Sequence, residues 1–130
     1  MKCNRTRAVC LAMLGVLALG LATPLFAHHS KSMYDLDKTI NFECTVTEVA
    51  WGNPHVLFLA DVKAPGSVTN WNLEGPSPNV LVSKGLKADT LKVGDKITVT
   101  GNPRKDGKPH MLLVTVTDTS GKHYTLVDNQ

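Results

Sequence analysis

Residues 39–51, TINFECTVTEVAW, predict the first strand of the fold and its shape. Apolar and polar residues alternate from Ile40 to Val46, which is the pattern of a strand with one buried face. The alternation then slips by one residue before Val49. Since one extra residue in a strand makes a β-bulge, we predict a bulge near Thr47-Glu48 that bends this strand.

Turn residues divide the rest of the chain into short extended segments. Glycine, proline, asparagine, aspartate or serine residues predict turns at 52–54, 64–67, 106–107 and 121. Further strands are predicted at 56–62, 68–74, 110–116 and 122–126. Another predicted strand begins at 97–100. The first three predicted strands follow one another through short turns. We therefore expect them to form an antiparallel meander.

One short helix is predicted between the third and the fourth strand. Ser77 is a suitable N-cap, Pro78 fits the first helical position, and Gly85 fits the C-terminal stop. Three strands, a helix and then two strands is the element order of an OB-fold. We therefore predict a mainly β protein, a small five- to six-stranded OB-like Greek-key barrel with one short helix between strands 3 and 4.

The N-terminus has the features of a secretory signal peptide. Lys2, Arg5 and Arg7 precede an uncharged apolar stretch at 8–22, and the small residue Ala27 follows a helix-breaking proline. The alternative is an uncleaved membrane anchor, which needs about 20 apolar residues, more than this stretch offers. We therefore predict a periplasmic or secreted protein with no stable membrane anchor after cleavage.

Cleavage after Ala27 divides the chain into a signal peptide at 1–27, an N-terminal segment of the mature chain at 28–38, and an OB-like barrel domain at 39–130. Cys44 is then the only cysteine left, so no intramolecular disulfide is expected, and its place on the apolar face predicts a small core residue. The formal net charge of +3 comes from the three basic residues of the signal peptide. Because the remaining charges balance, nucleic acid is not an expected partner.

Two histidines, His28 and His29, would begin the mature chain. A free N-terminal histidine can bind a metal ion through its α-amino nitrogen and ring Nδ1, and a further imidazole completes a three-nitrogen set that suits Cu(II). His55 follows Asn53-Pro54 in a predicted loop and is the candidate third ligand. The alternatives are a frayed terminus for the first two residues and a turn-closing histidine for the third.

Other residues are candidates for supporting roles. A ligating imidazole is usually oriented by a carboxylate, and Glu74 at the end of the third predicted strand is the candidate, with simple solvation as the alternative. Trp51 and Trp71 could form a stacking platform of the kind that OB-folds use, although core packing is the more common role of such residues. No catalytic motif is present, so a binding protein is expected rather than an enzyme.

Several short motifs support this interpretation by resemblance. They are Ala27–Ser30, Tyr34-Asp35, Val46–Val49 with Trp51, Asn53–His55, Trp71–Glu74, Ser77–Asn79, Leu91–Asp95 and Arg104–Gly107. Together they resemble a family of small secreted bacterial proteins of unknown function, over nearly the whole mature chain. The resemblance implies an exported OB-like β domain without a known activity. It also groups as residues of interest His28, His29, His55, Trp71, Glu74 and Asn79.

Two functional hypotheses follow. The first is an exported barrel that binds copper, or zinc, through His28, His29 and His55, with Glu74 as the orienting carboxylate. The second is a metal-free OB-like module that binds a small ligand or an envelope protein through the face around its tryptophans. Oxidative copper chemistry at the N-terminal chelate is a third hypothesis, for which no substrate surface is evident.

Overall fold

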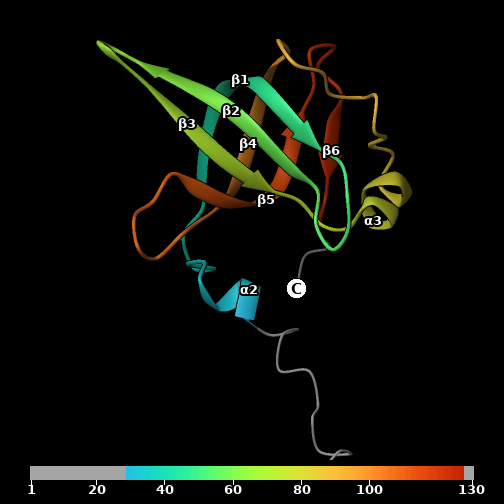
Figure 1. Ribbon diagram of the computed structural model, residues 1–130, viewed down its shortest axis with the longest axis horizontal. Coiled ribbons are helices and arrows are strands. Elements are labelled where there is room, and N and C mark those ends of the chain that lie inside the picture. Colours follow the sequence, from blue (N-terminus) through green and yellow to red (C-terminus); the bar gives the residue numbers. More distant parts are fainter. Residues whose placement is uncertain (1–28, 128–130) are drawn as a thin grey trace, which may run out of the picture.

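The computed structural model describes residues 29–127, and the side chains of residues 31–127 (Figure 1). The predicted signal peptide and His28 lie outside the described residues. The elements are, in chain order, α2 (His29–Ser32), β1 (Ile40–Ala50), β2 (Leu57–Ala64), β3 (Ser67–Glu74), α3 (Pro78–Ser83), β4 (Lys96–Pro103), β5 (His110–Thr117) and β6 (His123–Thr125).

Five strands close into a barrel. They are hydrogen-bonded in the order β3-β2-β1-β4-β5, and a parallel pairing between β3 and β5 closes the sheet. β6 pairs with β5 as an extra strand, and α3 lies between β3 and β4 in the chain. This is the topology of the predicted OB-like barrel, and it is confirmed. In Figure 1 α3 lies to one side of the barrel, α2 lies below it, and the β2–β3 hairpin projects at the upper left.

The long strand β1 serves both halves of the barrel. Its residues 40–45 pair with β4, and its residues 45–50 pair with β2. The pairing with β2 shifts register between Val46 and Glu48, which confirms the predicted bulge. The extra residue turns the strand so that one continuous segment can face two neighbours in succession.

A second register shift lies in β4, between Thr100 and Gly101. The backbones come so close there that a Cβ added at Gly101 would lie 2.4 Å from the carbonyl oxygen of Leu112. Gly101 therefore stands where only glycine fits, and β4, which was predicted to begin at 97–100, runs from Lys96 to Pro103.

One apolar core fills the barrel, formed by the inward faces of the strands. Val46, Phe58, Leu73, Val99 and Met111 come from the five barrel strands, and each is at most 1% exposed. Because neighbours along a strand face opposite sides, the residue that follows Leu73 and the one that precedes Met111 face outward. These outward positions carry polar side chains, and the candidate site lies there.

The remaining local predictions agree with the structure. Pro78 opens α3, and Gly85, at φ +88°, follows it in the left-handed conformation that a helix stop requires. Ser77 is the N-cap by position but makes no side-chain capping bond. Cys44 is buried in the core at 3% exposure, as its place on the apolar face predicted.

Candidate functional site

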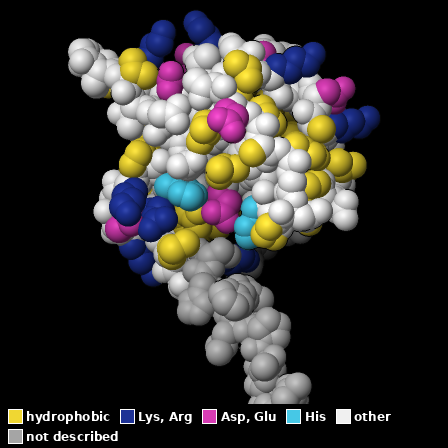
Figure 2. Space-filling model, in the orientation of Figure 1, with side chains coloured by type: hydrophobic (Ala, Val, Ile, Leu, Met, Phe, Trp, Pro, Cys, Tyr) yellow, Lys and Arg dark blue, Asp and Glu magenta, His cyan; other side chains and the backbone are white. Residues whose placement is uncertain are grey.

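A carboxylate lies where three parts of the chain meet at one rim of the barrel. Glu74 ends β3 and faces outward, His110 begins β5 beside it, and His55 belongs to the loop between β1 and β2. This face of the molecule carries an acidic side chain between two histidine side chains (Figure 2). In OB-folds the β1–β2 and β4–β5 loops flank the ligand-binding face, so the rim is the expected place for a site.

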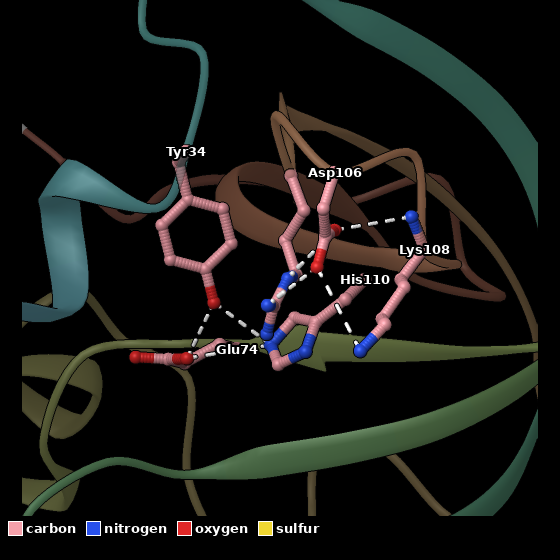
Figure 3. Close-up of polar contacts among 6 residues, drawn as sticks. Tyr34, Glu74, Asp106, Lys108 and His110 are labelled. Atoms are coloured by element: carbon pink, nitrogen blue, oxygen red, sulfur yellow. Dashed lines mark hydrogen bonds and ion pairs between the residues drawn. The ribbon is translucent and has the colours of Figure 1, made fainter.

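Three side chains contact the two oxygens of Glu74. His55 Nδ1 lies 3.1 Å from Oε1, while the hydroxyl of Tyr34 donates to Oε2 at 2.6 Å. His110 Nε2 lies 3.4 Å from the same Oε2 and 2.8 Å from the Tyr34 hydroxyl (Figure 3). We call these four residues the Glu74 cluster.

The positions of the protons in the Glu74 cluster follow from which atoms can only accept hydrogen bonds. A carboxylate accepts, so the Tyr34 proton points to Glu74 and the hydroxyl oxygen is left to accept from His110 Nε2. By the same argument His55 carries its proton on Nδ1. The His55 side chain is 42% exposed, so its ring also meets solvent. The arrangement presents one imidazole nitrogen as an accessible ligand.

Burial sets the protonation of the two members of the cluster that lie deepest. Tyr34 is 1% exposed, and burial together with the hydrogen bond to Glu74 raises the pKa of its hydroxyl well above the ordinary value. Burial lowers the pKa of His110 below 6.5, against the opposing effect of the Glu74 charge. Tyr34 therefore stays protonated, and His110 is neutral at pH 7.

Within residues 31–127, the charge of Glu74 interacts with that of Arg104 as well as with its histidine neighbours. The groups of that region that come within ion-pair distance of its carboxylate are the imidazoles of His55 and His110. Its side chain is only 13% exposed, so water screens the charge incompletely. The carboxylate is thus largely buried, with two imidazoles and the Tyr34 hydroxyl in contact with it.

The β4–β5 loop stands beside the cluster and is held in shape by its own ion pair. Arg104 binds both oxygens of Asp106, at 3.0 Å from Nε and 2.7 Å from Nη2, and the Asp106 carboxylate also accepts from the backbone of Lys108 (Figure 3). The Arg104 contact lowers the pKa of Asp106. Gly107, at φ +75°, forms the predicted turn. The ion pair and the turn thus stabilise the conformation of the β4–β5 loop beside the Glu74 cluster.

The segment before the barrel is bonded to β4 and to this loop. Asp35 N donates to Pro103 O at 2.9 Å, and Lys105 N donates to Met33 O at 3.0 Å. The buried amide of Asn102 donates to Lys38 O at 2.8 Å. From Met33 onward the chain is therefore part of the folded domain, packed along the barrel.

The structure brings two of the predicted metal-site residues together, His55 and Glu74. His29 opens α2, but its side chain lies outside the described part, as does all of His28. Within the side chains described, no group of three or more histidine, cysteine, aspartate or glutamate residues has the geometry to hold a metal ion. No helix in the described region is long and apolar enough to cross a membrane.

The other predicted residues lie apart from these contacts. Trp51 and Trp71 are half-buried and pack against the core, and the Trp71 ring lies 4.9 Å from that of Phe42. Asn79 is exposed in α3. The packing of both tryptophans matches the core role that was the alternative to a stacking platform.

Two members of the cluster, Tyr34 and His110, were not among the predicted site residues. Tyr34 belonged to a motif of the family resemblance, and His110 opened a predicted strand, but neither carried a local signal of its partner. They are 76 residues apart in sequence, and their contact depends on barrel closure. A tyrosine in a polar N-terminal segment was the signal that could have found the first of them, since such a residue usually has something to pack against.

Fold and site together define an OB-like β-barrel protein with a carboxylate, two imidazoles and a buried tyrosine at its rim. The chain belongs to a family of unknown function, DUF6152, whose model matches residues 16–113. No curated protein matches the chain. The family has no known function, so the function has to be argued from the site.

Proposed function

We propose that this chain is an exported, small β-barrel protein that binds a transition metal ion, copper in preference to zinc. After removal of residues 1–27, the amine and ring of His28, together with His29, supply nitrogen ligands, and His55 supplies another. Glu74 orients His55. The observation that carries the proposal is the contact between Glu74 Oε1 and His55 Nδ1 at 3.1 Å.

This contact is the usual arrangement behind a metal-binding histidine. The carboxylate accepts from one ring nitrogen, which fixes the tautomer and the orientation of the ring and makes the other nitrogen more basic. His55 is exposed enough for that second nitrogen to meet an ion. An ion bound there would also lie close to the charge of Glu74, whose side chain is only 13% exposed.

The second support is the distance that the chain can cover. Tyr34 and His55 bind opposite oxygens of Glu74, so the N-terminal segment passes directly beside the candidate ligand. His29 precedes Tyr34 by five residues, a length that spans at most about 18 Å when fully extended. One helical turn, α2, shortens that span further. The length of this segment is compatible with the proposed joint site of the terminus and His55.

The ligand chemistry favours copper. An amine and imidazole nitrogens form a nitrogen-only set, which suits the tetragonal coordination of Cu(II) and binds it more tightly than Zn(II). The set needs a free amine at His28, so it forms only after the signal peptide has been removed. Export and metal binding are therefore linked in this proposal.

The test is a Cu(II) and Zn(II) titration of protein produced through its export route and shown by mass to begin at His28. We expect one Cu(II) per chain at sub-micromolar Kd, weaker Zn(II) binding, and a loss of at least tenfold in Cu(II) affinity in His55→Ala. His123→Ala is the matched control, because His123 is exposed on β6 and bonds to Thr117. Absence of Cu(II) binding at micromolar protein would refute the proposal.

A further inference from the structure

We propose that this chain forms a twofold-symmetric dimer through the outer edge of β3, where two copies of the segment Ser67–Trp71 pair as antiparallel strands. The interaction surface is the projecting end of the β2–β3 hairpin. The proposal is independent of the proposed metal site.

The outer edge of β3 is covered along part of its length. β3 pairs with β2 from Ser67 to Glu74, but its pairing with β5 begins at Asn72. In the part of the chain that the structure describes, no strand pairs with this edge between Ser67 and Trp71. The uncovered segment belongs to the hairpin that projects from the barrel in Figure 1.

The backbone groups that face outward at this edge follow from the register. Asn72 N donates to Pro109 O on the β5 side, so the N–H of Asn72 points away from β2. Because the direction of these groups alternates along a strand, the N–H and C=O of Asn70 and of Val68 also point away from β2. The open edge therefore offers the donors and acceptors of both residues to a partner.

The open edge of β3 lacks the features that protect free strands from pairing. Such strands usually carry a lysine, a proline or a bulge, or are very short. β3 has 8 residues, its pairing with β2 has no register shift, and residues 67–73 include no charged residue and no proline. The other edge strand, β6, has 3 residues and follows Lys122. The edge of β3 is thus suited to pairing with another strand.

The edge is held in its extended shape before any partner binds. Asn70 Nδ2 donates to Asp61 Oδ1 at 2.7 Å and to Thr47 Oγ1 at 3.2 Å, which joins β3 through its side chain to β2 and β1. A strand that is ordered in the free protein loses less conformational entropy on binding than a flexible one. The hairpin therefore presents its edge in the conformation that pairing needs.

A second copy of the same strand fits this edge. In an antiparallel pair centred on Thr69, Val68 of each copy lies opposite Asn70 of the other, and the two residues exchange N–H···O bonds in both directions. A twofold axis brings Thr69, which is exposed, opposite Thr69 of the second copy, and threonine pairs of this kind are favourable. Like charges that meet across such an axis repel, and residues 67–73 carry none.

The side chains along the edge favour a second copy over a strand of another protein. Strands of other proteins are selected by pockets that take up alternate side chains. The exposed side chains of Ser67, Val68 and Thr69 are small, so they leave little depth for such selection. Because so short a contact buries less than the about 1,200 Å² of a stable interface, we expect the dimer to form reversibly.

Sedimentation equilibrium of the metal-free protein, produced through its export route, tests the proposal over micromolar to millimolar concentrations. We expect a monomer–dimer equilibrium whose dissociation constant rises at least tenfold in Thr69→Lys, because two lysines would then face each other. Thr125→Lys is the matched control, since Thr125 is an exposed threonine on the edge strand β6, and it should dimerise as wild type does. A protein that stays monomeric throughout, or a dimer that Thr69→Lys leaves unchanged, would overturn the proposal.

A mixture of Thr69→Lys and Thr69→Asp separates a specific contact from a loss of structure. Each variant alone should be mainly monomeric, whereas the equimolar mixture should form a heterodimer, because lysine and aspartate then face each other. A mixture that associates no more strongly than either variant alone would contradict the pairing centred on Thr69.

Val68→Pro tests the backbone bonds of the same edge without adding charge. Proline removes an outward N–H, and because that group points away from β2, the hairpin itself keeps its bonds. We expect this variant to be monomeric, with a thermal unfolding midpoint close to that of wild type. A Val68→Pro protein that still dimerises with wild-type affinity would show that the contact lies elsewhere.

Discussion

The hydroxyl of Tyr34 donates a 2.6 Å hydrogen bond to Glu74, 40 residues further along the chain. This bond joins the segment before the barrel to the end of β3. The other oxygen of the same carboxylate binds His55, so a single side chain connects the N-terminal segment with the candidate metal ligand. The barrel rim is thereby built around one largely buried negative charge.

Cys44 should be unreactive in the folded protein. Burial raises the pKa of its thiol to about 12, so at pH 8 only about one thiol in 10,000 is ionised. We expect no reaction of Cys44 with a disulfide reagent such as Ellman's reagent at pH 8 over minutes, and reaction of Cys44 once the protein is unfolded in guanidinium. Rapid reaction of the folded protein would contradict the burial of this residue.

His110 should make the metal-free protein less stable as the pH falls below 6.5. Its pKa in the folded state lies below that value because of burial, so the unfolded chain binds the proton more readily in this range. The groups that face it are Tyr34, Glu74, Arg104 and Asp106. Urea unfolding between pH 5 and 8 measures the effect. His110→Gln should show a flatter pH dependence than wild type, and an unchanged slope would count against the assignment.

Gly101→Ala should destabilise the barrel by about 1–3 kcal/mol, the usual cost of overpacking. The added Cβ would lie 2.4 Å from Leu112 O and 2.8 Å from Met111 Sδ. Gly52→Ala is the control, because a Cβ there meets nothing within 4 Å. Chemical denaturation of both variants makes the comparison. Equal stabilities would show that β4 and β5 do not approach so closely.

Trp71→Ala should cost about 2 kcal/mol of stability, roughly half of what a fully buried tryptophan contributes. The ring is half-buried against the core and lies beside that of Phe42. Thermal unfolding followed by circular dichroism measures the loss. A variant of unchanged stability would instead favour a surface role for this residue, as in the metal-free hypothesis.

The fold could be predicted from the sequence because local residue patterns determine its main elements. The alternation at residues 40–46 assigns one face to the core, and the slip after it requires a bulge, whatever the rest of the chain does. The OB-like order of elements also places the loop of His55 and the end of the third strand at one rim. The approach of His55 to Glu74 thus follows from topology.

The rest of the cluster could not be predicted in this way. His110 reaches Glu74 only because β3 and β5 pair in parallel, a contact between strands that are not neighbours in the chain. Tyr34 reaches both through a segment with no periodic pattern, held by isolated backbone bonds. Such contacts depend on which strands become neighbours when the barrel closes. The local spacing of residues in the sequence does not predict this.

Pulsed electron paramagnetic resonance of the Cu(II)-loaded, processed protein would decide whether His55 binds copper, because it detects the remote nitrogen of each coordinated imidazole. We expect a signal from the His55 imidazole that is lost in His55→Ala and kept in His123→Ala. We also expect changed coordination when methionine precedes His28. An identical spectrum for wild type and His55→Ala would contradict the claim that the barrel rim and the N-terminus share one copper ion.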